Sequence, residues 1–361
     1  MALLERPTAR SVDHATVDHT GVDRTPDTMR TVQFARYGSA DVLELTVVAK
    51  PQVGDDDVLV EVHAAALNPI DWHFMTGLPY AARLQFGLRH PKVTRIGADF
   101  AGTVEAVGRN ITKFQPRDEV FGTVNGETPD HPLPELGACS DYVRVSQDRI
   151  VRTPAHVSLR QAAAVGTAGV TALQGLRDVG RLRAGQHVLI NGACGGVGTY
   201  AVQIAKALDA EVTAVCGSGH VEVLYSIGAD HVVDYTRDDF TLGDRRYDVM
   251  LDNVGNRSLS ECRRVMHLES VYIASFGQPQ HRWTGPAFRL LRMYASRPFV
   301  SQDMRTWVAR PSSDDLTFLA GLFEAGRLTS VIDRTYQLRD IACAMRHLAA
   351  GHARGKVVIT L

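Results

Sequence analysis

The sequence lacks the marks of several large protein classes. No apolar stretch approaches the roughly 20 residues that a membrane-spanning helix needs, and the formal net charge of −1 over 361 residues offers no electrostatic basis for binding nucleic acid. The five cysteines are scattered, with no CxxC pair and no Cys/His cluster, so neither a disulfide framework nor a zinc module is indicated. No signal peptide is visible. We therefore expect a cytoplasmic protein with no integral membrane segment and no nucleic-acid partner.

The length and the pattern of apolar residues favour two domains. Residues 1–28 carry no apolar periodicity and are predicted to be a disordered N-terminal extension. Short runs separated by Gly, Pro and Asp follow over 29–153 and are typical of an antiparallel β-barrel. Strands and helices alternate over 154–297, which predicts a parallel sheet with helices on both faces. Residues 298–361 show a residue pattern similar to that of the first half of the chain, so we expect them to return to the barrel domain.

A glycine-rich turn points to a dinucleotide cofactor. The stretch "ACGGVG" stands between the apolar strand "HVLI" and a helix with one apolar stripe. Glycines there permit a tight turn and a close approach of the backbone, and the helix N-terminus presents N–H groups to a pyrophosphate. The first glycine of the usual fingerprint is an alanine here. The residues predicted to hold the cofactor at this turn are Ala193, Gly195, Gly196, Val197 and Gly198.

The turn after the next strand favours NADPH over NADH. NAD sites place Asp or Glu roughly 20 residues after the glycines, on the ribose 2′-hydroxyl. The corresponding stretch, "VCGSGH", contains no carboxylate that would repel a 2′-phosphate. Ser218 can donate a hydrogen bond to that phosphate, and Tyr235 and Arg237 follow at the end of the strand after it.

Several spaced motifs resemble one enzyme superfamily: "NPIDW", "IGADFAGTVEAVG", "AAAVGTAGVTALQGL", "ACGGVG", "YDVMLDNVG" and "GHARGKVVITL". From about residue 30 onward the chain is similar to the medium-chain dehydrogenases/reductases, and within them to the zinc-independent quinone oxidoreductase (zeta-crystallin-like) branch. The resemblance implies an α/β fold in which a Rossmann doubly wound parallel sheet joins a GroES-like antiparallel β-barrel domain. It also implies a cofactor in the cleft between the domains, and it suggests a homodimer.

Further cofactor-binding residues carry over from these motifs. Thr171 looks like the family's nicotinamide-contacting threonine, and Asn253 and Gly255 follow the strand "YDVMLD", where the family approaches the nicotinamide ribose. Ser275 and Phe276 end the next strand, at the carboxyl edge where doubly wound sheets bind their ligands.

The motifs also bear on the metal. Zinc alcohol dehydrogenases of the superfamily have a ligand cysteine where this chain has Asn68, and a Gly-His-Glu where it has "GADFAG" at 97–102. A catalytic zinc needs three protein ligands, and two of the expected ones are missing. We therefore expect no metal, and without a Lewis acid to ionise an alcohol, simple alcohol oxidation is disfavoured.

What remains is hydride delivery to a small-molecule acceptor that is already electrophilic, such as a quinone or an α,β-unsaturated carbonyl. Asn68 can donate a hydrogen bond to the oxygen on which negative charge develops. Asp71 is the nearest ionisable residue in the same motif, with a turn-stabilising role as the alternative. Tyr80 is a candidate proton donor, although many tyrosines only pack.

Three functions stay open at this point: an NADPH-dependent quinone reductase, a reductase of enones, alkenals or enoyl thioesters, and a protein that binds NADPH without catalysis. Two basic segments, 83–95 and 282–310, suggest either a lip for a large lipid-like or anionic acceptor, or a solvated face or oligomer contact. Arg354 and Lys356 near the C-terminus are candidates for the cofactor phosphates, with a surface role as the alternative.

Overall fold

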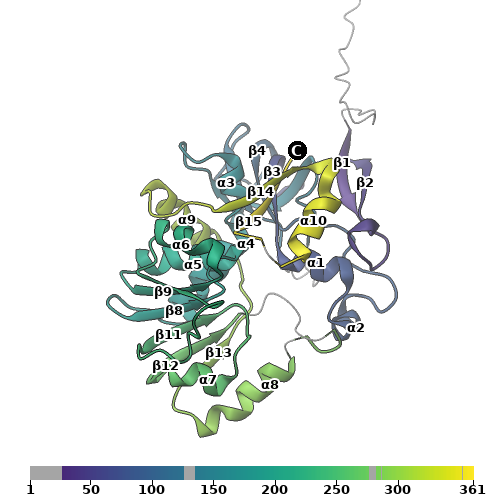
Figure 1. Ribbon diagram of the computed structural model, residues 1–361. Helices are drawn as coiled ribbons and strands as arrows, with labels where there is room; N and C mark the ends of the chain where they lie inside the picture. Colours follow the sequence, from purple (N-terminus) through teal and green to yellow (C-terminus); the bar gives the residue numbers. More distant parts are fainter. Residues whose placement is uncertain (1–26, 126–134, 276–281, 286, 352) are drawn as a thin grey trace, which may run out of the picture.

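A parallel sheet of six strands forms one half of the molecule (Figure 1). The computed structural model describes residues 27–125, 135–275, 282–285, 287–351 and 353–361. The strand order is β10-β9-β8-β11-β12-β13, and every pair is parallel. The strands are β8 (His187–Asn191), β9 (Glu211–Cys216), β10 (His231–Asp234), β11 (Tyr247–Asp252), β12 (Met266–Ala274) and β13 (Asp303–Thr306). The order reverses between β8 and β11, which confirms the predicted doubly wound sheet and places its switch point there.

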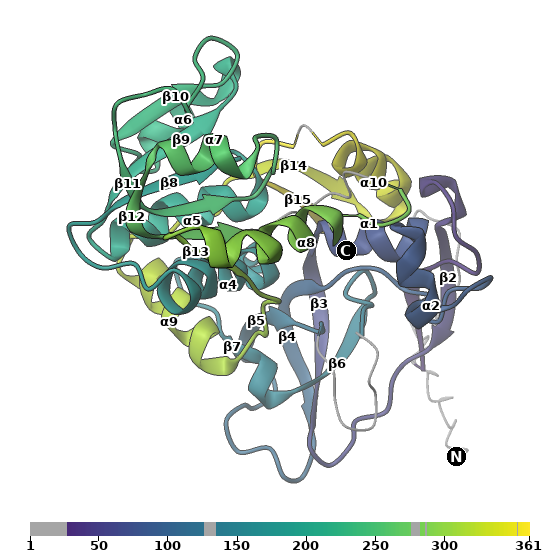
Figure 2. The same cartoon turned by 90° about the horizontal axis from the view of Figure 1, so that it is seen from below.

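Helices cover both faces of this sheet, which is why its strands read as nearly continuous apolar runs. Successive residues of β8 enter different cores: Val188 and Ile190 pack with α4, α5 and α9, whereas Leu189 packs with α7 and α8. Figure 2, seen from below, shows α7 and α8 on the near side of the sheet. The helices are α4 (Gly166–Leu173), α5 (Gly196–Ala207), α6 (Val221–Ser226), α7 (Leu259–Arg264), α8 (Ala287–Ser296) and α9 (Ser313–Glu324).

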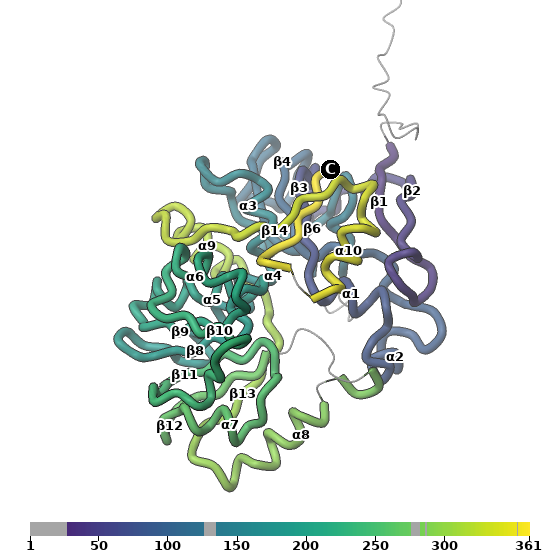
Figure 3. Tube along the Cα trace, viewed as in Figure 1, coloured from purple at the N-terminus to yellow at the C-terminus, as the bar shows by residue number. Residues whose placement is uncertain are grey.

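A mostly antiparallel sheet forms the other half, in the order β14-β15-β3-β4-β5-β7, with β6 also paired to β3. Only β14 and β15 run parallel to each other. The strands are β3 (Asp57–Leu67), β4 (Asp99–Val107), β5 (Glu119–Thr123), β6 (Tyr142–Ser146), β7 (Ile150–Arg152), β14 (Ile332–Gln337) and β15 (Lys356–Thr360). In Figure 3 the yellow C-terminal segment lies among the purple and blue N-terminal strands, as expected for a GroES-like domain built from both ends of the chain.

Shorter elements complete the molecule, and most of them belong to this half. An antiparallel pair, β1 (Thr28–Gln33) and β2 (Glu44–Ala49), lies beside the sheet. The α-helices are α1 (Pro69–Thr76), α2 (Arg83–Phe86), α3 (Leu159–Ala163) and α10 (Ile341–Ala349). The 3-10 helices are η1 (Ala40–Val42), η2 (Tyr80–Ala82), η3 (Gln147–Arg149), η5 (Ser218–His220), η6 (Arg297–Phe299) and η7 (Leu338–Asp340), and η4 (Gln174–Val179) is a π-helix.

The predicted domain limits need one correction. The chain does not return to the first domain at residue 298, because β13 still pairs with β12 in the parallel sheet; it rejoins the antiparallel half only with β14. The short strand escaped prediction because it lies in a basic segment interrupted by proline. The predicted extension 1–28 lies almost wholly outside the described residues, and its last residue, Thr28, begins β1. No helix within the described ranges is long and apolar enough to span a membrane.

The two halves share one core. Ala64 and Ala66 of β3 and Phe121 of β5 belong to the same cluster of buried side chains as Val188 and Ile190 of β8. The helix α3 packs on β3 and β4, and α4 packs on α5. The antiparallel half is thus packed directly against the helices that precede the parallel sheet, which brings β3 and β15 close to the start of α5.

Candidate functional site

The glycine-rich turn lies at the switch point, between β8 and α5. Gly192, with φ of 76°, makes the left-handed bend that ends the strand. A Cβ on Gly198 would lie 2.2 Å from the carbonyl oxygen of Gly192, so helix and turn pack too closely for a side chain there. A Cβ on Gly195 would come no nearer than 3.5 Å to protein atoms. Glycine at 195 therefore keeps open the space in front of the α5 N-terminus, whose first N–H groups have no partner within the helix.

The other predicted residues of this turn lie around it. Ala193 is fully buried and its N–H donates to the carbonyl of Val215 at 3.1 Å. Gly196 begins α5, and Val197 packs against the core. Gly192 was not among the predicted residues, although a glycine directly after an apolar strand is itself a signal for a tight turn.

The turn after β9 gathers the residues predicted for the adenosine end. The Ser218 hydroxyl donates to Asp234 Oδ2 at 2.6 Å. The Tyr235 ring lies beside the same turn and is 53% exposed. Arg354 reaches the turn from the C-terminal segment, with its guanidinium 3.6 Å from the position that a Cβ on Gly219 would take.

Asp234 is a carboxylate that the sequence analysis missed. The turn "VCGSGH" contains none, but the end of β10 supplies one to Ser218, 16 residues away in the chain. Hydrogen bonds from Ser218 and Thr236 lower the pKa of Asp234, so this side chain is ionised at neutral pH. The turn after β9 therefore combines one carboxylate with the guanidinium of Arg354.

The carboxyl ends of β11 and β12 meet around a buried carboxylate, Asp252. Its Oδ1 accepts from the N–H of Gly255 at 2.8 Å and from Asn191 Nδ2 at 2.8 Å. Its Oδ2 accepts from the Tyr272 hydroxyl at 2.6 Å and lies 3.4 Å from Arg289 Nη2. Asp252 thus fixes the bend that follows β11.

The predicted residues at this edge stand around that bend. Asn253 Nδ2 donates to the carbonyl of Asn191 at 3.2 Å, while its Oδ1 is buried and has no partner in the described part of the chain. The N–H of Ser275 donates to the carbonyl of Asp252 at 2.9 Å. Phe276 lies outside the described residues. A buried amide oxygen without a partner fits a site that takes hydrogen-bond donors from a bound molecule.

Asn68 lies in a buried polar cluster at the end of β3. It caps the N-terminus of α1 and is only 3% exposed. Its Nδ2 donates to Asp99 Oδ2 at 2.9 Å and to the carbonyl of Ala66 at 3.3 Å, and its Oδ1 accepts from Lys356 Nζ. Both N–H bonds of the amide predicted to serve as an oxyanion donor are therefore used inside the protein. Neither Asp99 nor this contact of Lys356 was anticipated, because three separate segments meet here.

Asp71 holds the backbone of this cluster. One of its carboxylate oxygens accepts from the N–H of Asn68 and the other from the N–H of Gly97, both at 2.7 Å. Burial raises the pKa of Asp71 to about 7, against the lowering effect of these two hydrogen bonds. These contacts match the turn-stabilising alternative, a capping box at the start of α1.

The helix α4 connects Asp99 with Thr171. Asp99 Oδ1 accepts from the Thr167 N–H at 2.8 Å and from its hydroxyl at 2.6 Å. One turn later the Thr171 hydroxyl donates to the carbonyl of Thr167 at 2.7 Å, and this side chain is half-buried. The predicted nicotinamide contact therefore lies on the helix that Asp99 caps.

Tyr80 lies on η2, away from the Asn68 cluster's hydrogen bonds. Its ring meets that of Trp283 edge to face at 5.1 Å, and the Arg83 guanidinium lies 4.8 Å from its centre. The N–H of Tyr80 also donates to the carbonyl of Arg282 at 2.8 Å. Both basic segments thus contact Tyr80, one through Arg83 and the other through Arg282 and Trp283.

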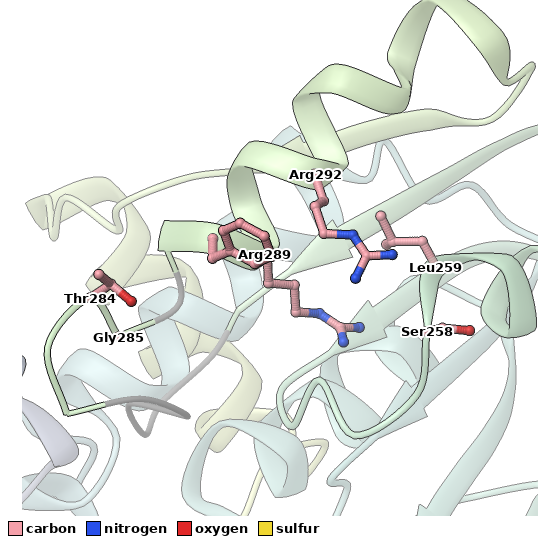
Figure 4. A pocket seen from close by; sticks show the side chains of 7 residues that line it. Ser258, Leu259, Thr284, Gly285, Arg289 and Arg292 are labelled. Atoms are coloured by element: carbon pink, nitrogen blue, oxygen red, sulfur yellow. The ribbon is translucent and has the colours of Figure 1, made fainter.

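A cavity of about 550 Å³ lies between α7 and α8 (Figure 4). Arg289 and Arg292 extend from α8 toward Ser258 and Leu259 at the start of α7. Arg289 Nη1 donates to the carbonyl of Gly255 at 2.8 Å, so the cavity adjoins the bend after β11. The other described residues that line it are Thr284, Gly285 and Phe288, and none of the described lining residues is acidic.

Two family models match the chain. The alcohol dehydrogenase GroES-like domain matches residues 54–155, and the zinc-binding dehydrogenase family matches 227–359. The 2-methylene-furan-3-one reductase of Solanum lycopersicum is 31% identical and covers 92% of this chain and 79% of its own length. The NADPH-dependent alkenal/one oxidoreductase of Arabidopsis thaliana is 29% identical over 96% of this chain and 83% of its own. The quinone oxidoreductase structure from Coxiella burnetii superposes with a TM-score of 0.78 at 28% identity, covering 92% and 99% of the two chains.

The fold, the glycine-rich turn and these similarities define an oxidoreductase of the medium-chain dehydrogenase/reductase superfamily. Within that superfamily the chain belongs to the zinc-independent quinone oxidoreductase-like branch. The names of the relatives support a nicotinamide cofactor. The glycine-rich turn and the unpartnered Asn253 Oδ1 fit such a molecule.

The description of one family model as zinc-binding raises the question of a metal site. Within the described ranges, no three His, Cys, Asp or Glu side chains form a group that would hold a metal ion. The cluster where the zinc enzymes are expected to place ligands consists of an amide, a carboxylate and the ammonium of Lys356. An ammonium in that cluster repels a cation, so these residues do not fit zinc.

Proposed function

We propose that this protein is a zinc-independent oxidoreductase that transfers hydride from NADPH to a quinone-type acceptor. The observation that carries the proposal is the direct contact between the two halves of the site. The Lys356 side chain lies against Gly196, the first residue of α5, and bonds to Asn68 at the start of α1. A dinucleotide held at α5 would therefore have its reactive end near the polar cluster around Asn68.

The bound cofactor supplies the hydride, and the protein supplies the binding and the orientation. The N-terminus of α5 and the open space at Gly195 are proposed to hold the pyrophosphate. Asn253 is proposed to accept a hydrogen bond from the nicotinamide riboside through its unpartnered Oδ1. Thr171 on α4 and Ser275 after β12 are proposed to border the ring, with Gly255 providing close backbone approach.

Asn68 is proposed to face the acceptor oxygen. Because both of its N–H bonds have protein acceptors, donation to that oxygen requires the longer bond, 3.3 Å to Ala66, to open. The bond to Asp99 would then keep the amide in place. Tyr80 is the proposed proton donor, since its hydroxyl belongs to a half-exposed side chain, whereas both oxygens of Asp71 are bound to backbone N–H groups.

NADPH is preferred in this proposal because Ser218, Tyr235 and Arg354 surround the turn after β9. Asp234 opposes that preference, since its charge would repel a 2′-phosphate. Arg354, beside Gly219 of the same turn, is proposed to offset this charge. The proposal therefore requires Ser218 to rotate from Asp234 to the phosphate when the cofactor binds.

The cavity between α7 and α8 is proposed to take the part of a large acceptor that is remote from the reacting atom. It adjoins Gly255 and presents Arg289, Arg292 and an aromatic ring, Phe288. Such a lining suits an acceptor with an apolar tail or an anionic group.

A second candidate is the reduction of α,β-unsaturated carbonyls: enones, alkenals or enoyl thioesters. The observation that favours it is the pair of relatives named as a 2-methylene-furan-3-one reductase and an alkenal/one oxidoreductase. The same residues would serve, because both reactions place negative charge on an oxygen that needs a hydrogen-bond donor.

A panel of acceptors tests the proposal. The purified protein is mixed with NADPH and, in turn, benzoquinones, naphthoquinones, enones, an enoyl thioester and simple aldehydes, and NADPH oxidation is followed optically. We expect the fastest turnover with quinones, none with simple aldehydes, and rates that do not change after treatment with a chelator. Turnover confined to enones or thioesters would select the second candidate. Tight NADPH binding without turnover would indicate a non-catalytic protein, and activity lost to a chelator and restored by zinc would overturn the metal argument.

A further inference from the structure

Lys356 is a lysine that the fold places inside the protein. It is the first residue of β15, and only 3% of its surface is exposed. The antiparallel register of β15 and β3 pairs Val357 with Leu67, so one step further along the ladder Lys356 is level with Asn68. Lysine is rarely buried to this extent without a partner, so its contacts explain why it is tolerated.

The side chain of Lys356 bridges the two halves of the site. Its Nζ donates to Asn68 Oδ1 and lies 3.7 Å from Asp99 Oδ2. Its stem lies over the start of α5, where Cδ would be 3.0 Å from a Cβ on Gly196. A single side chain therefore touches the phosphate-binding helix with its stem and the Asn68 amide with its head.

These contacts determine how the Asn68 amide is oriented. An amide has one accepting and one donating end, and the two ends are nearly the same size. The Lys356 ammonium can only donate and the Asp99 carboxylate can only accept, so together they hold Oδ1 toward the lysine and Nδ2 toward the aspartate. Among the described residues the ammonium is the donor that holds Oδ1, whereas the Asp99 carboxylate and the carbonyl of Ala66 hold Nδ2.

The charges around the ammonium come from two neighbouring elements. Asp99 begins β4, and Asp71 lies in the first turn of α1. Burial lowers the pKa of Lys356, and both carboxylates act in the opposite direction. An ion pair between Lys356 and Asp99 alone would be a structural feature of modest value, since buried ion pairs are often replaceable by apolar residues. The hydrogen bond to Asn68 is what gives the lysine a further role.

We propose that Lys356 is a positioning residue that fixes the Asn68 amide relative to the first turn of α5, and so keeps the acceptor half of the site aligned with the dinucleotide half. The expected loss of kcat rests on the proposed function, whereas the orientation of Asn68 by Lys356 does not. Lys356 acts on the reaction through Asn68, and the pyrophosphate remains bound by backbone groups of α5.

The test compares Lys356→Met with the wild type. Methionine keeps an unbranched apolar stem over Gly196 and removes the ammonium. We expect kcat with the best acceptor of the panel to fall about tenfold or more, because small displacements of a positioned group carry penalties of this order. We expect the dissociation constant of NADPH, measured by its fluorescence, to change by less than about threefold. A variant with wild-type kcat would overturn the proposal, as would one that loses kcat only through weaker NADPH binding.

A double-mutant cycle tests whether Lys356 works through Asn68. We expect Asn68→Ala and Lys356→Met to be non-additive, with the double variant within about twofold of Asn68→Ala alone in kcat. Losses that multiply would contradict the proposal. Because Lys356→Met leaves Asp99 buried without its cation, the variant Lys356→Met/Asp99→Asn is included. We expect it to regain thermal stability without regaining kcat, whereas recovery of both would show that the lysine is only structural.

A crystal structure of a Lys356 variant provides a readout that needs no known acceptor. We expect the Asn68 side chain of the Lys356→Met or the Lys356→Met/Asp99→Asn protein to leave its wild-type orientation while α5 stays in place. An unmoved Asn68 would overturn the inference. If the wild type oxidised NADPH with none of the acceptors in the panel, the proposed function would be refuted. The orientation of Asn68 in the crystal would still test the role of Lys356.

Discussion

At the scale of single residues, the site depends on carboxylates whose partners come from distant parts of the chain. Asp99 is satisfied by Asn68, Thr167 and Lys356, and Asp252 by Gly255 and Tyr272 among others. Each carboxylate holds the groups that donate to it in one conformation. Two further aspartates lead to predictions. The role of Asp71 is tested by the dependence of Tm on pH, and that of Asp234 by the preference for NADPH over NADH.

Asp71 should make stability depend on pH. Its carboxyl has an ordinary pKa of 3.8, which burial raises to about 7 in the folded protein. Between these values the folded state holds a proton that the unfolded state has released, so the contribution of this group is fully present below the lower value and is lost as the pH rises through the upper one. We expect the difference in Tm between wild type and Asp71→Asn to shrink as the pH is raised from about 4 to about 7. A difference that stays constant over this window would show that Asp71 does not titrate there.

Asp234 should limit the preference for NADPH. Its ionised carboxylate accepts from Ser218, the residue proposed to meet the 2′-phosphate. We expect Asp234→Asn to raise kcat/KM for NADPH relative to NADH about two- to fivefold, as exposed charge interactions usually allow. Asp238→Asn, an exposed neighbour, is the control and should leave the ratio unchanged. An unchanged ratio in Asp234→Asn would show that the 2′-phosphate does not bind beside Asp234.

At the scale of elements, the turn between β8 and α5 separates two kinds of glycine. Gly198 is required by packing, because the backbone of Gly192 and Ala193 occupies the space of a side chain. Gly195 has room for a Cβ on the protein side, so packing does not require glycine there, and the proposed pyrophosphate site in front of it does. The sequence pattern identified both positions but did not distinguish these two reasons.

Matched alanine substitutions distinguish them. Gly198→Ala should lower the free energy of unfolding by about 1–3 kcal/mol or more, because a methyl group cannot be accommodated against rigid backbone. Gly195→Ala should keep nearly wild-type thermal stability and weaken NADPH binding, measured by fluorescence titration. Equal effects of the two substitutions on stability, or unchanged binding in Gly195→Ala, would contradict this assignment.

At the scale of the whole molecule, charge is distributed unevenly although the formal net charge is −1. The segment before α8 meets η2 through the hydrogen bond from the N–H of Tyr80 to the carbonyl of Arg282, and the Arg83 guanidinium lies over the Tyr80 ring. Exposed apolar side chains lie in the same region, among them Leu84 at 81% and Phe288 at 66% exposure. A large acceptor approaching the cavity beside α8 would meet both.

Arg292 allows this arrangement to be tested. Two benzoquinones with the same alkyl tail are compared, one ending in a methyl group and one in a carboxylate. We expect Arg292→Gln to raise KM for the carboxylate compound about two- to fivefold and to leave the other unchanged. Arg160→Gln, at an exposed position of α3, removes the same charge far from the cavity and is the control. Equal shifts with both quinones would show that the remote part of the acceptor does not reach Arg292.

Much of the fold could be predicted because it follows from local patterns. Alternation of strands and helices specifies a parallel sheet, and the glycine-rich turn after β8 marks its ligand-binding edge. The prediction failed at β13, a four-residue strand in a basic segment, because so short an element has no periodicity of its own and forms only by pairing with β12. Asp234 was missed for a related reason: it reaches Ser218 only through the parallel pairing of β9 and β10.

The sequence by itself determined the class of the protein, the glycine-rich turn after β8 and the position of Asn68 at the start of α1, since each depends on motifs of residues that are neighbours in the chain. Only the tertiary structure decided which groups surround Asn68. Lys356 is 288 residues away from it, and the hydrogen bond between them exists because β15 pairs with β3. The orientation of a buried amide depends on donors and acceptors that come together only after folding, so it cannot be predicted from the spacing of residues along the chain.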